Sequence, residues 1–178
     1  MKPLNRINTN LSTSRPIRVI QFGEGNFLRA FVDYALHVLN RDTAFDGSVA
    51  VVQPIPNGLV DLLASQDGLY TLLQKGVAKG EIIDNQDVID VIEKCINPYK
   101  QITAYEQLAK LDTLEFVFSN TTESGIRYDE KDTYDSNPPN TFPGKLTLLL
   151  HKRFEHFNGD ASKGLTIIPC ELINNNAD

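Results

Sequence analysis

A glycine turn between an apolar run and a helical pattern, in the sequence IRVIQFGEGNFLRAF at 17–31, constrains this chain more than any other feature. The apolar run, Ile17–Phe22, is typical of a buried strand. Apolar residues then recur at intervals of three and four over 26–40, which predicts an amphipathic helix with Asp33 on its polar side. A second run rich in β-branched residues, Ser48–Gln53, ends at a proline and predicts a second strand. Together they predict a βαβ unit with parallel strands.

Strand and helix patterns alternate along the rest of the chain. In order they predict an antiparallel hairpin at 70–92, a helix at 103–111, a strand at 115–118, an irregular stretch at 129–144, a helix at 146–157 and a strand at 165–170. The expected fold class is therefore α/β, a Rossmann-like, doubly wound and mostly parallel sheet with an inserted antiparallel hairpin. Residues 1–16 are polar and are expected to form a leader before a single domain at 17–178.

Composition excludes several classes of function. A net charge of −6 over 178 residues is unsuited to a nucleic-acid surface. The chain has no apolar run long enough for a membrane span and no signal-peptide pattern, so a cytoplasmic protein is expected. Its three histidines have no metal-ligand spacing, so no metal site is expected. Cys95 and Cys170 are expected to be reduced thiols, with a disulfide between them left as an alternative.

The turn has the first two glycines of a dinucleotide-binding turn. Gly23 permits the sharp bend from strand to helix, and Gly25 lets the backbone approach a pyrophosphate without a Cβ in the way. The phosphate would then face free N–H groups and the positive end of the helix dipole. Leu28 stands where a third glycine is usual. The alternative is a tight turn that needs glycine for its geometry alone.

Two further segments are expected at the same edge of the sheet. The second strand ends at Gln53, where NAD sites usually carry an acidic residue for the adenosine ribose. Its amide oxygen can accept from a ribose hydroxyl, so NAD is expected but NADP is not excluded; a solvent-facing strand end is the alternative. The segment SNTTESG, at 119–125, follows a buried strand and offers small polar groups to a cofactor.

Five motifs together resemble the mannitol dehydrogenase family of polyol-specific long-chain dehydrogenases. They are QFGEGNFLRAF at 21–31, QDGLYT at 66–71, FVFSNTTESGI at 116–126, RFEHFNG at 153–159 and IIPCELI at 167–173. Within that family the resemblance is strongest to the tagaturonate reductase branch. It implies a cytoplasmic, NAD-dependent interconversion of D-tagaturonate and D-altronate in hexuronate breakdown. It leaves the oligomeric state open.

The resemblance also implies roles for particular residues. The pyrophosphate turn of the family is matched by Gly23, Gly25, Asn26 and Phe27, and the loop near the nicotinamide by Asn120, Thr121 and Thr122. Asn176 matches an asparagine that can polarise the substrate carbonyl, although Leu172 departs from the family pattern close by; a frayed terminal segment before a helix is the alternative. Family members are longer, and a second, helical domain carries their catalytic lysine and most sugar-acid contacts. No residue at 1–178 corresponds to that lysine.

Other functions stay open from the sequence. Fructuronate reductases and mannitol-type polyol dehydrogenases belong to the same family. A non-catalytic nucleotide-binding α/β domain would also carry the glycine turn. A methyltransferase shares the turn but usually has an acid after its second strand, and Gln53 followed by Pro54 argues against it.

Overall fold

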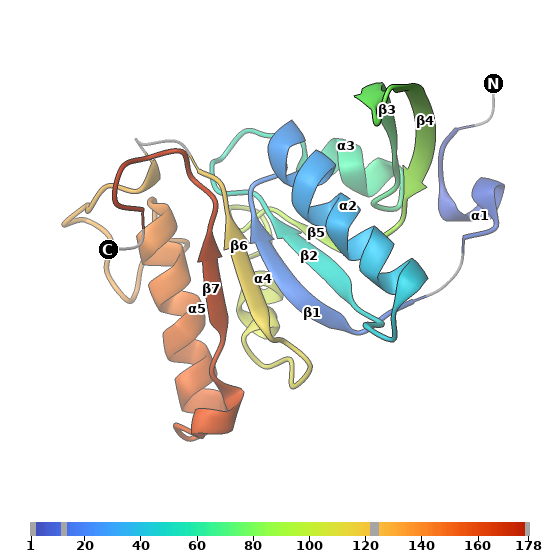
Figure 1. Ribbon diagram of the computed structural model, residues 1–178. Helices are drawn as coiled ribbons and strands as arrows, with labels where there is room; N and C mark the ends of the chain where they lie inside the picture. The colour runs from blue at the N-terminus through green and yellow to red at the C-terminus, as the bar shows by residue number, and fades with distance from the viewer. Residues whose placement is uncertain (1–2, 12–13, 122–124, 177–178) are drawn as a thin grey trace.

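The computed structural model describes residues 3–11, 14–121 and 125–176. The strands are β1 (Ile17–Phe22), β2 (Ser48–Val52), β3 (Tyr70–Ala78), β4 (Glu81–Ile89), β5 (Ile92–Ile96), β6 (Phe116–Ser119) and β7 (Thr166–Pro169). The helices are α1 (Arg6–Thr9), α2 (Asn26–Asp42), α3 (Val60–Ser65), α4 (Ile102–Leu108), α5 (Phe142–His156) and the 3₁₀ helix η2 (Ala161–Lys163). Within the described ranges, five strands form one sheet in the order β5-β2-β1-β6-β7 (Figure 1).

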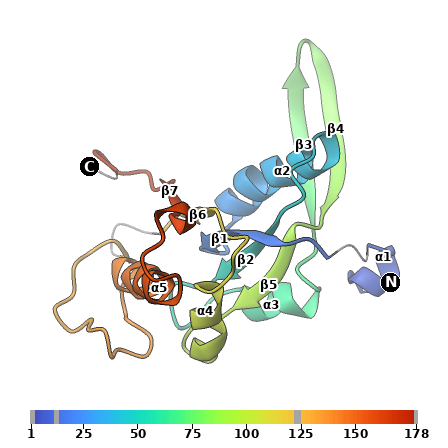
Figure 2. The same ribbon diagram turned by 90° about the horizontal axis from the view of Figure 1, so that it is seen from below.

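The sheet is doubly wound, as predicted, and every pair of neighbouring strands in it is parallel. One face packs against α4 and α5 through a cluster that includes Phe22, Tyr105 and Leu149. The other face packs against α2 and the base of the hairpin through a cluster that includes Val32 and Tyr70. Figure 2 shows α2 and the hairpin on the side of the sheet opposite to α4 and α5. Both faces are therefore buried, as the apolar strands require.

The inserted hairpin is also confirmed. Strands β3 and β4 pair antiparallel in continuous register, from Tyr70 opposite Ile89 to Ala78 opposite Glu81. Lys79 and Gly80 both have positive φ, which suits a two-residue hairpin turn. Figure 2 shows the distal half of the hairpin projecting away from the sheet.

The structure extends the predicted elements in four places. Strand β5 begins at Ile92, where the predicted hairpin ended, and joins the parallel sheet beside β2; it was not predicted as a separate strand. Helix α3 was not predicted, because six residues are too few to establish a period. Helix α5 begins at Phe142 rather than 146, since Thr141 caps it and Pro143 is tolerated in the first turn. The segment expected as a leader contains α1, from which Arg6 donates to the Ile92 carbonyl at 3.0 Å.

Asp33 does not lie on a solvated face of α2, so that expectation was wrong. Its side chain is fully buried, while Phe27 and Phe31 on the same helix are half exposed or more. The hairpin explains the difference, because it covers a second face of α2 and brings Tyr70 against Asp33. The periodicity of apolar residues in α2 shows which face packs on the sheet, but it does not show the second face that packs against the hairpin. In the part of the chain that is described, no helix is both long enough and apolar enough to cross a bilayer.

Candidate functional site

The site lies where the order of strands reverses. Strand β1 lies between β2 and β6, and the chain passes from β1 to β2 on one side before it returns to β6 on the other. Ligands of open α/β sheets bind at the carboxyl ends of the strands at such a point. A hollow of about 220 Å³ is present there. Its lining comprises Gly23, Glu24, Gly25, Pro54, Ile55, Leu59, Asn120, Thr121, Gly125, Asn140 and Phe142.

Gly23 closes the bend at the end of β1. Its φ of +122° is rarely adopted by residues with a side chain, and an added Cβ would lie 3.3 Å from both the Asn120 carbonyl oxygen and Leu28 Cδ1. Its N–H donates to the Val52 carbonyl at 3.0 Å, which joins the bend to β2. Leu28, at the usual place of a third glycine, is buried in the core instead. The geometry of Gly23 therefore accounts for the first glycine of the turn.

Gly25 has a different environment from Gly23. It is the N-cap residue of α2 with φ −70°, which any L-residue can adopt. A Cβ built on it meets no atom within 4 Å, and Gly25 lines the hollow. The space that a side chain would fill thus adjoins the first N–H groups of a 17-residue helix. This arrangement suits an anion, because those groups and the helix dipole both favour negative charge.

Arg29 lies one helical turn further along α2, and its side chain stabilises the glycine turn. Its Nε donates to the Glu24 carbonyl at 3.0 Å, and its Nη2 donates to Asn26 Oδ1 at 2.5 Å. The side chain of Asn26 is therefore engaged with its own helix. Asn26 and Phe27 border the turn but do not line the hollow, and the ring of Phe27 packs on Phe31 with centroids 5.5 Å apart.

Gln53 is buried at the end of β2, not facing solvent, and it holds the loop that follows. Its Nε2 donates to the Ile55 carbonyl at 2.8 Å, and its Oε1 accepts from the Val60 N–H at 3.3 Å. Glu24 binds the same loop, because its Oε1 accepts from the Leu59 N–H at 3.0 Å. The carboxylate of Glu24 and the amide of Gln53 both adjoin Gly58, so an acid from the glycine turn lies near the strand end where an acid is usual.

The loop after β6 is held by the end of β7. Asn120 Nδ2 donates to the Cys170 carbonyl at 2.7 Å, and the Thr121 N–H donates to Glu171 Oε1 at 3.0 Å. Asn176 Nδ2 donates to the Glu171 carbonyl at 3.0 Å and to Glu171 Oε2 at 3.4 Å. Glu171, which is buried, therefore joins two segments whose roles were predicted separately. Thr122 lies outside the described residues.

Four of the predicted site residues, Gly23, Gly25, Asn120 and Thr121, meet in the hollow. Sequence reasoning missed Glu24, Ile55, Leu59, Asn140 and Phe142, which also line the hollow. Glu24 carried a usable signal, as a carboxylate within the turn itself. The other four lie in segments for which the sequence pattern showed no periodicity, so nothing in the sequence placed them there.

A buried lysine holds that irregular stretch against α5. Lys145 Nζ donates to the Pro139 carbonyl at 2.6 Å, to the Asn140 carbonyl at 2.8 Å and to the Tyr99 hydroxyl at 3.0 Å. Burial lowers the pKa of Lys145 to about 8, against the opposing charge of Asp132. Three oxygen acceptors satisfy its three donors, so Lys145 fixes Asn140 at the rim of the hollow.

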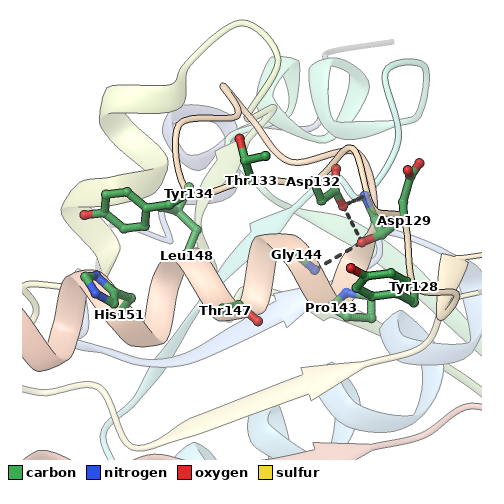
Figure 3. A pocket seen from close by; sticks show the side chains of 11 residues that line it. Tyr128, Asp129, Asp132, Thr133, Tyr134, Pro143, Gly144, Thr147, Leu148 and His151 are labelled. Carbon is green, nitrogen blue, oxygen red and sulfur yellow. Dashed lines mark hydrogen bonds between the residues drawn. The ribbon is translucent and has the colours of Figure 1, made fainter.

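A second hollow, of about 280 Å³, lies between α5 and the loop that precedes it (Figure 3). Asp132 Oδ2 accepts from the Thr141 hydroxyl at 2.5 Å, and Thr141 Oγ1 accepts from the Gly144 N–H at 3.1 Å. These bonds cap α5 and tie the loop to it. None of the predicted site residues lines this hollow.

The strand-end hollow fits a dinucleotide better than a metal. Over the described ranges no three His, Cys, Asp or Glu side chains gather as metal ligands. Thr121 Oγ1 is buried without a hydrogen-bond partner among the described residues, and Thr121 lines the same hollow as Gly25. An unpaired hydroxyl and a helix N-terminus are the groups that a sugar and a pyrophosphate would engage. Cys95 and Cys170 are both free thiols.

Residues 17–178 match the profile of the mannitol dehydrogenase Rossmann domain. An altronate oxidoreductase of Phocaeicola vulgatus is 51% identical over 173 residues, which cover 97% of this chain and 36% of that protein. An altronate oxidoreductase of Bacillus subtilis is 46% identical over 178 residues, which cover 100% of this chain and 37% of that protein. The chain thus spans little more than a third of the length of these curated relatives.

Solved structures show the same fold at lower identity. The ternary complex of Pseudomonas fluorescens mannitol 2-dehydrogenase with NAD and D-mannitol superposes with a TM-score of 0.75 at 21% identity, over 96% of this chain and 39% of that one. A substrate-free D-sorbitol dehydrogenase superposes with a TM-score of 0.72 at 18% identity, over 97% of this chain and 40% of that one.

The two glycines of the turn should respond differently to substitution. Gly23→Ala should lower the free energy of unfolding by about 2 kcal/mol or more, because alanine is strained at a positive φ and has two close contacts there. Gly25→Ala should stay within about 1 kcal/mol of the wild type, since only its N-cap preference changes. Urea unfolding followed by circular dichroism measures both. Equal losses at the two positions would contradict this account of the turn.

Proposed function

This chain belongs to the mannitol dehydrogenase family, and on that basis we propose that it is the cofactor-binding domain of an NAD-dependent altronate oxidoreductase, also called tagaturonate reductase. The observation that carries the proposal is the hollow at the strand reversal, with Gly25 open at a helix N-terminus. Relatives at 44–51% identity that are named altronate oxidoreductase support this substrate over the others of the family. The reaction interconverts D-tagaturonate and D-altronate.

NADH, when bound, supplies the hydride, and the chain supplies the surface that holds it. We assign the pyrophosphate to Gly23, Gly25 and the first N–H groups of α2, with Asn26 and Phe27 beside them. We assign the adenosine ribose to the carboxylate of Glu24. Gln53 lies near that carboxylate and fixes the loop that follows β2. Gln53 then acts on the nucleotide through that loop rather than by its own amide.

The nicotinamide half is assigned to the loop after β6. Asn120, Thr121 and Thr122 would face it, and the unpaired Thr121 hydroxyl is the group best suited to a ribose or carboxamide oxygen. Asn176 is the candidate donor to the substrate carbonyl. Asn176 Nδ2 donates both to the carbonyl of Glu171 and to its Oε2. A substrate oxygen would therefore replace one of these two acceptors or share the same nitrogen with them.

The proton donor is assigned to sequence outside this chain. Reduction of a ketone needs a proton on the developing alkoxide, and a lysine of the helical domain expected from the family would supply it. That domain would also bind most of the sugar acid. We place the reaction in the cytoplasm, in hexuronate breakdown, where two free thiols such as Cys95 and Cys170 stay reduced.

The test of the proposed function is NADH binding by the Gly25→Val variant. The branched side chain would occupy the space meant for the pyrophosphate, so we expect NADH affinity to fall by at least roughly tenfold. Gly76→Val is the matched control, because Gly76 also has open space around its Cβ but lies on β3 in the hairpin. Isothermal titration calorimetry with NADH measures both, after circular dichroism confirms that each variant is folded.

A folded Gly25→Val variant that binds NADH as tightly as Gly76→Val would refute the phosphate assignment. Binding of S-adenosylmethionine instead of NADH would point to the methyltransferase alternative. Binding of NADH without catalysis in any longer form of the protein would favour a nucleotide-binding domain that performs no chemistry.

Cofactor selectivity should depend on Glu24. We expect NADH to bind more tightly than NADPH, because the Glu24 carboxylate would repel a 2′-phosphate. Glu24→Gln keeps an oxygen acceptor for the Leu59 N–H and removes the charge. NADPH affinity should therefore rise by about fivefold, the effect of roughly 1 kcal/mol of charge repulsion, with little change for NADH. An unchanged ratio of the two affinities would assign selectivity to another group.

The chain by itself should not reduce D-tagaturonate at saturating NADH. Without the proton donor the reaction loses on the order of 10²–10⁴ in rate, and the second substrate is also not positioned. The assay follows NADH consumption with D-tagaturonate, D-fructuronate and D-fructose, for residues 1–178 and for a version extended through the following domain. Turnover by residues 1–178 would place the catalytic group within this chain. Faster reduction of fructuronate or fructose by the extended form would assign it to a sister branch.

A further inference from the structure

A buried polar group lies directly beneath the glycine turn. Asp33 on α2 and Gln21 on β1 are both fully buried, yet neither carries out any step assigned above. Gln21 Nε2 donates to the carbonyl of Gly23 at 3.0 Å, which connects this pair to the first glycine of the turn. The pair is therefore placed to affect the shape of the phosphate-binding segment.

The hydrogen bonds around Tyr70 suit a proton on Asp33. The Tyr70 hydroxyl oxygen lies 2.6 Å from the Arg29 carbonyl oxygen and 3.2 Å from Asp33 Oδ2. A tyrosine hydroxyl has one hydrogen, and the shorter contact, to a carbonyl that can only accept, uses it. At the longer contact the tyrosine oxygen can then accept from a protonated carboxyl of Asp33.

The remaining oxygens agree with a neutral acid. Asp33 Oδ1 and Gln21 Oε1 are both buried acceptors that have no hydrogen-bond partner among the described residues. An ionised carboxylate at this place would have the neutral donors Tyr70 and Gln21, and burying such a charge costs far more than burying a neutral carboxyl. Burial raises the pKa of Asp33 to about 7, although Tyr70, Gln21 and the charge of Arg29 oppose the rise.

The groups that face Asp33 come from every element packed against it. They are Arg29 on α2, Gln21 on β1, Tyr70 on β3 and Cys95 on β5. Burial, and then the charge of Asp33, raise the pKa of the Cys95 thiol to about 12, so this thiol stays neutral beside Asp33. Arg29 is the one cation in this set, and its guanidinium is engaged with the turn itself.

We propose that Asp33 is a positioning residue for the phosphate turn and acts as a neutral carboxylic acid, whose proton leaves Gln21 Nε2 free to hold the carbonyl of Gly23. On ionisation, the carboxylate draws the hydroxyl hydrogen of Tyr70 toward itself and competes for the amide of Gln21. The Arg29 carbonyl loses its donor from Tyr70, the bond from Gln21 to the Gly23 carbonyl is weakened, and the turn loosens. Cofactor binding is thereby coupled to the protonation of a residue that does not touch the cofactor. This inference rests on the proposed function, because it takes NADH as the ligand of the turn.

NADH affinity should therefore fall as the pH rises through the pKa of Asp33. We expect a loss of roughly fivefold, the equivalent of one neutral hydrogen bond, between about pH 5.5 and about pH 8.5. Asp33→Asn should bind NADH with the low-pH affinity of the wild type and show no such step, because its amide is neutral and can donate to Tyr70. Gln21→Leu should bind weakly at every pH. Asp42→Asn, on the exposed end of the same helix, is the matched control and should keep the step.

A second readout needs no cofactor. Because the pKa of Asp33 is raised from 3.8 in the unfolded chain to about 7, the native state holds a proton that the unfolded state releases. Its stabilising effect is complete below about pH 4 and is lost as the pH rises toward 7. The Tm of the wild type should fall relative to that of Asp33→Asn over this window and then run parallel to it.

These measurements distinguish a failure of the role proposed for Asp33 from a failure of the proposed function. Parallel Tm profiles for the wild type and Asp33→Asn across the whole window would overturn the neutral acid. A pH step in NADH affinity that persists in Asp33→Asn, or wild-type affinity in Gln21→Leu, would overturn the positioning role. Failure of the wild type to bind NADH would overturn the proposed function and the positioning role together, while the Tm profiles would still decide the protonation state.

Discussion

Two backbone hydrogen bonds just beyond the end of β1 hold the site together. The Gly23 N–H donates to the carbonyl of Val52, and the Asn120 N–H donates to the carbonyl of Phe22. They continue the parallel pairing of β1 with β2 and with β6 past the last residues of the strands. Because both neighbours are fixed at that point, the loops that follow them must diverge, and the hollow between them results. The glycine turn thus obtains its geometry from the sheet.

Three charged side chains hold the loops around the hollow, and only one of them, Glu24, also lines it. Glu24 holds the loop after β2, Glu171 holds the loop after β6, and Lys145 holds Asn140 at the rim. Each of these side chains is buried and bonds to backbone atoms. Such contacts restrict the loops before a ligand binds. The site is therefore preorganised in part by Glu171 and Lys145, which do not line the hollow.

Much of this arrangement was predictable from the sequence, and the failures have physical reasons. Strands β1, β2, β6 and β7 and helix α2 follow from local apolar patterns, and their order determined the fold class and the edge at which Gly23, Gly25, Asn120 and Thr121 meet. Helix α3 and the position of Asn140 depend on contacts between distant segments that leave no periodic trace. The burial of Asp33 is the clearest case, since α2 alone reads as having a single buried face. Only the hairpin, more than thirty residues later, supplies the tyrosine that covers the second one.

The projecting hairpin has a consequence for how this fold can change over evolution. Tyr70 and Ile89 at its base are buried in the core, whereas Leu73, Val77 and Ile82 further out are exposed. The outer strands are thus joined mainly to one another, and the Lys79–Gly80 turn has open space around it. Residues inserted at that turn would lengthen a surface ribbon without disturbing the sheet or the strand reversal. The tip of the hairpin is therefore a position at which related proteins can acquire new segments independently of the nucleotide site.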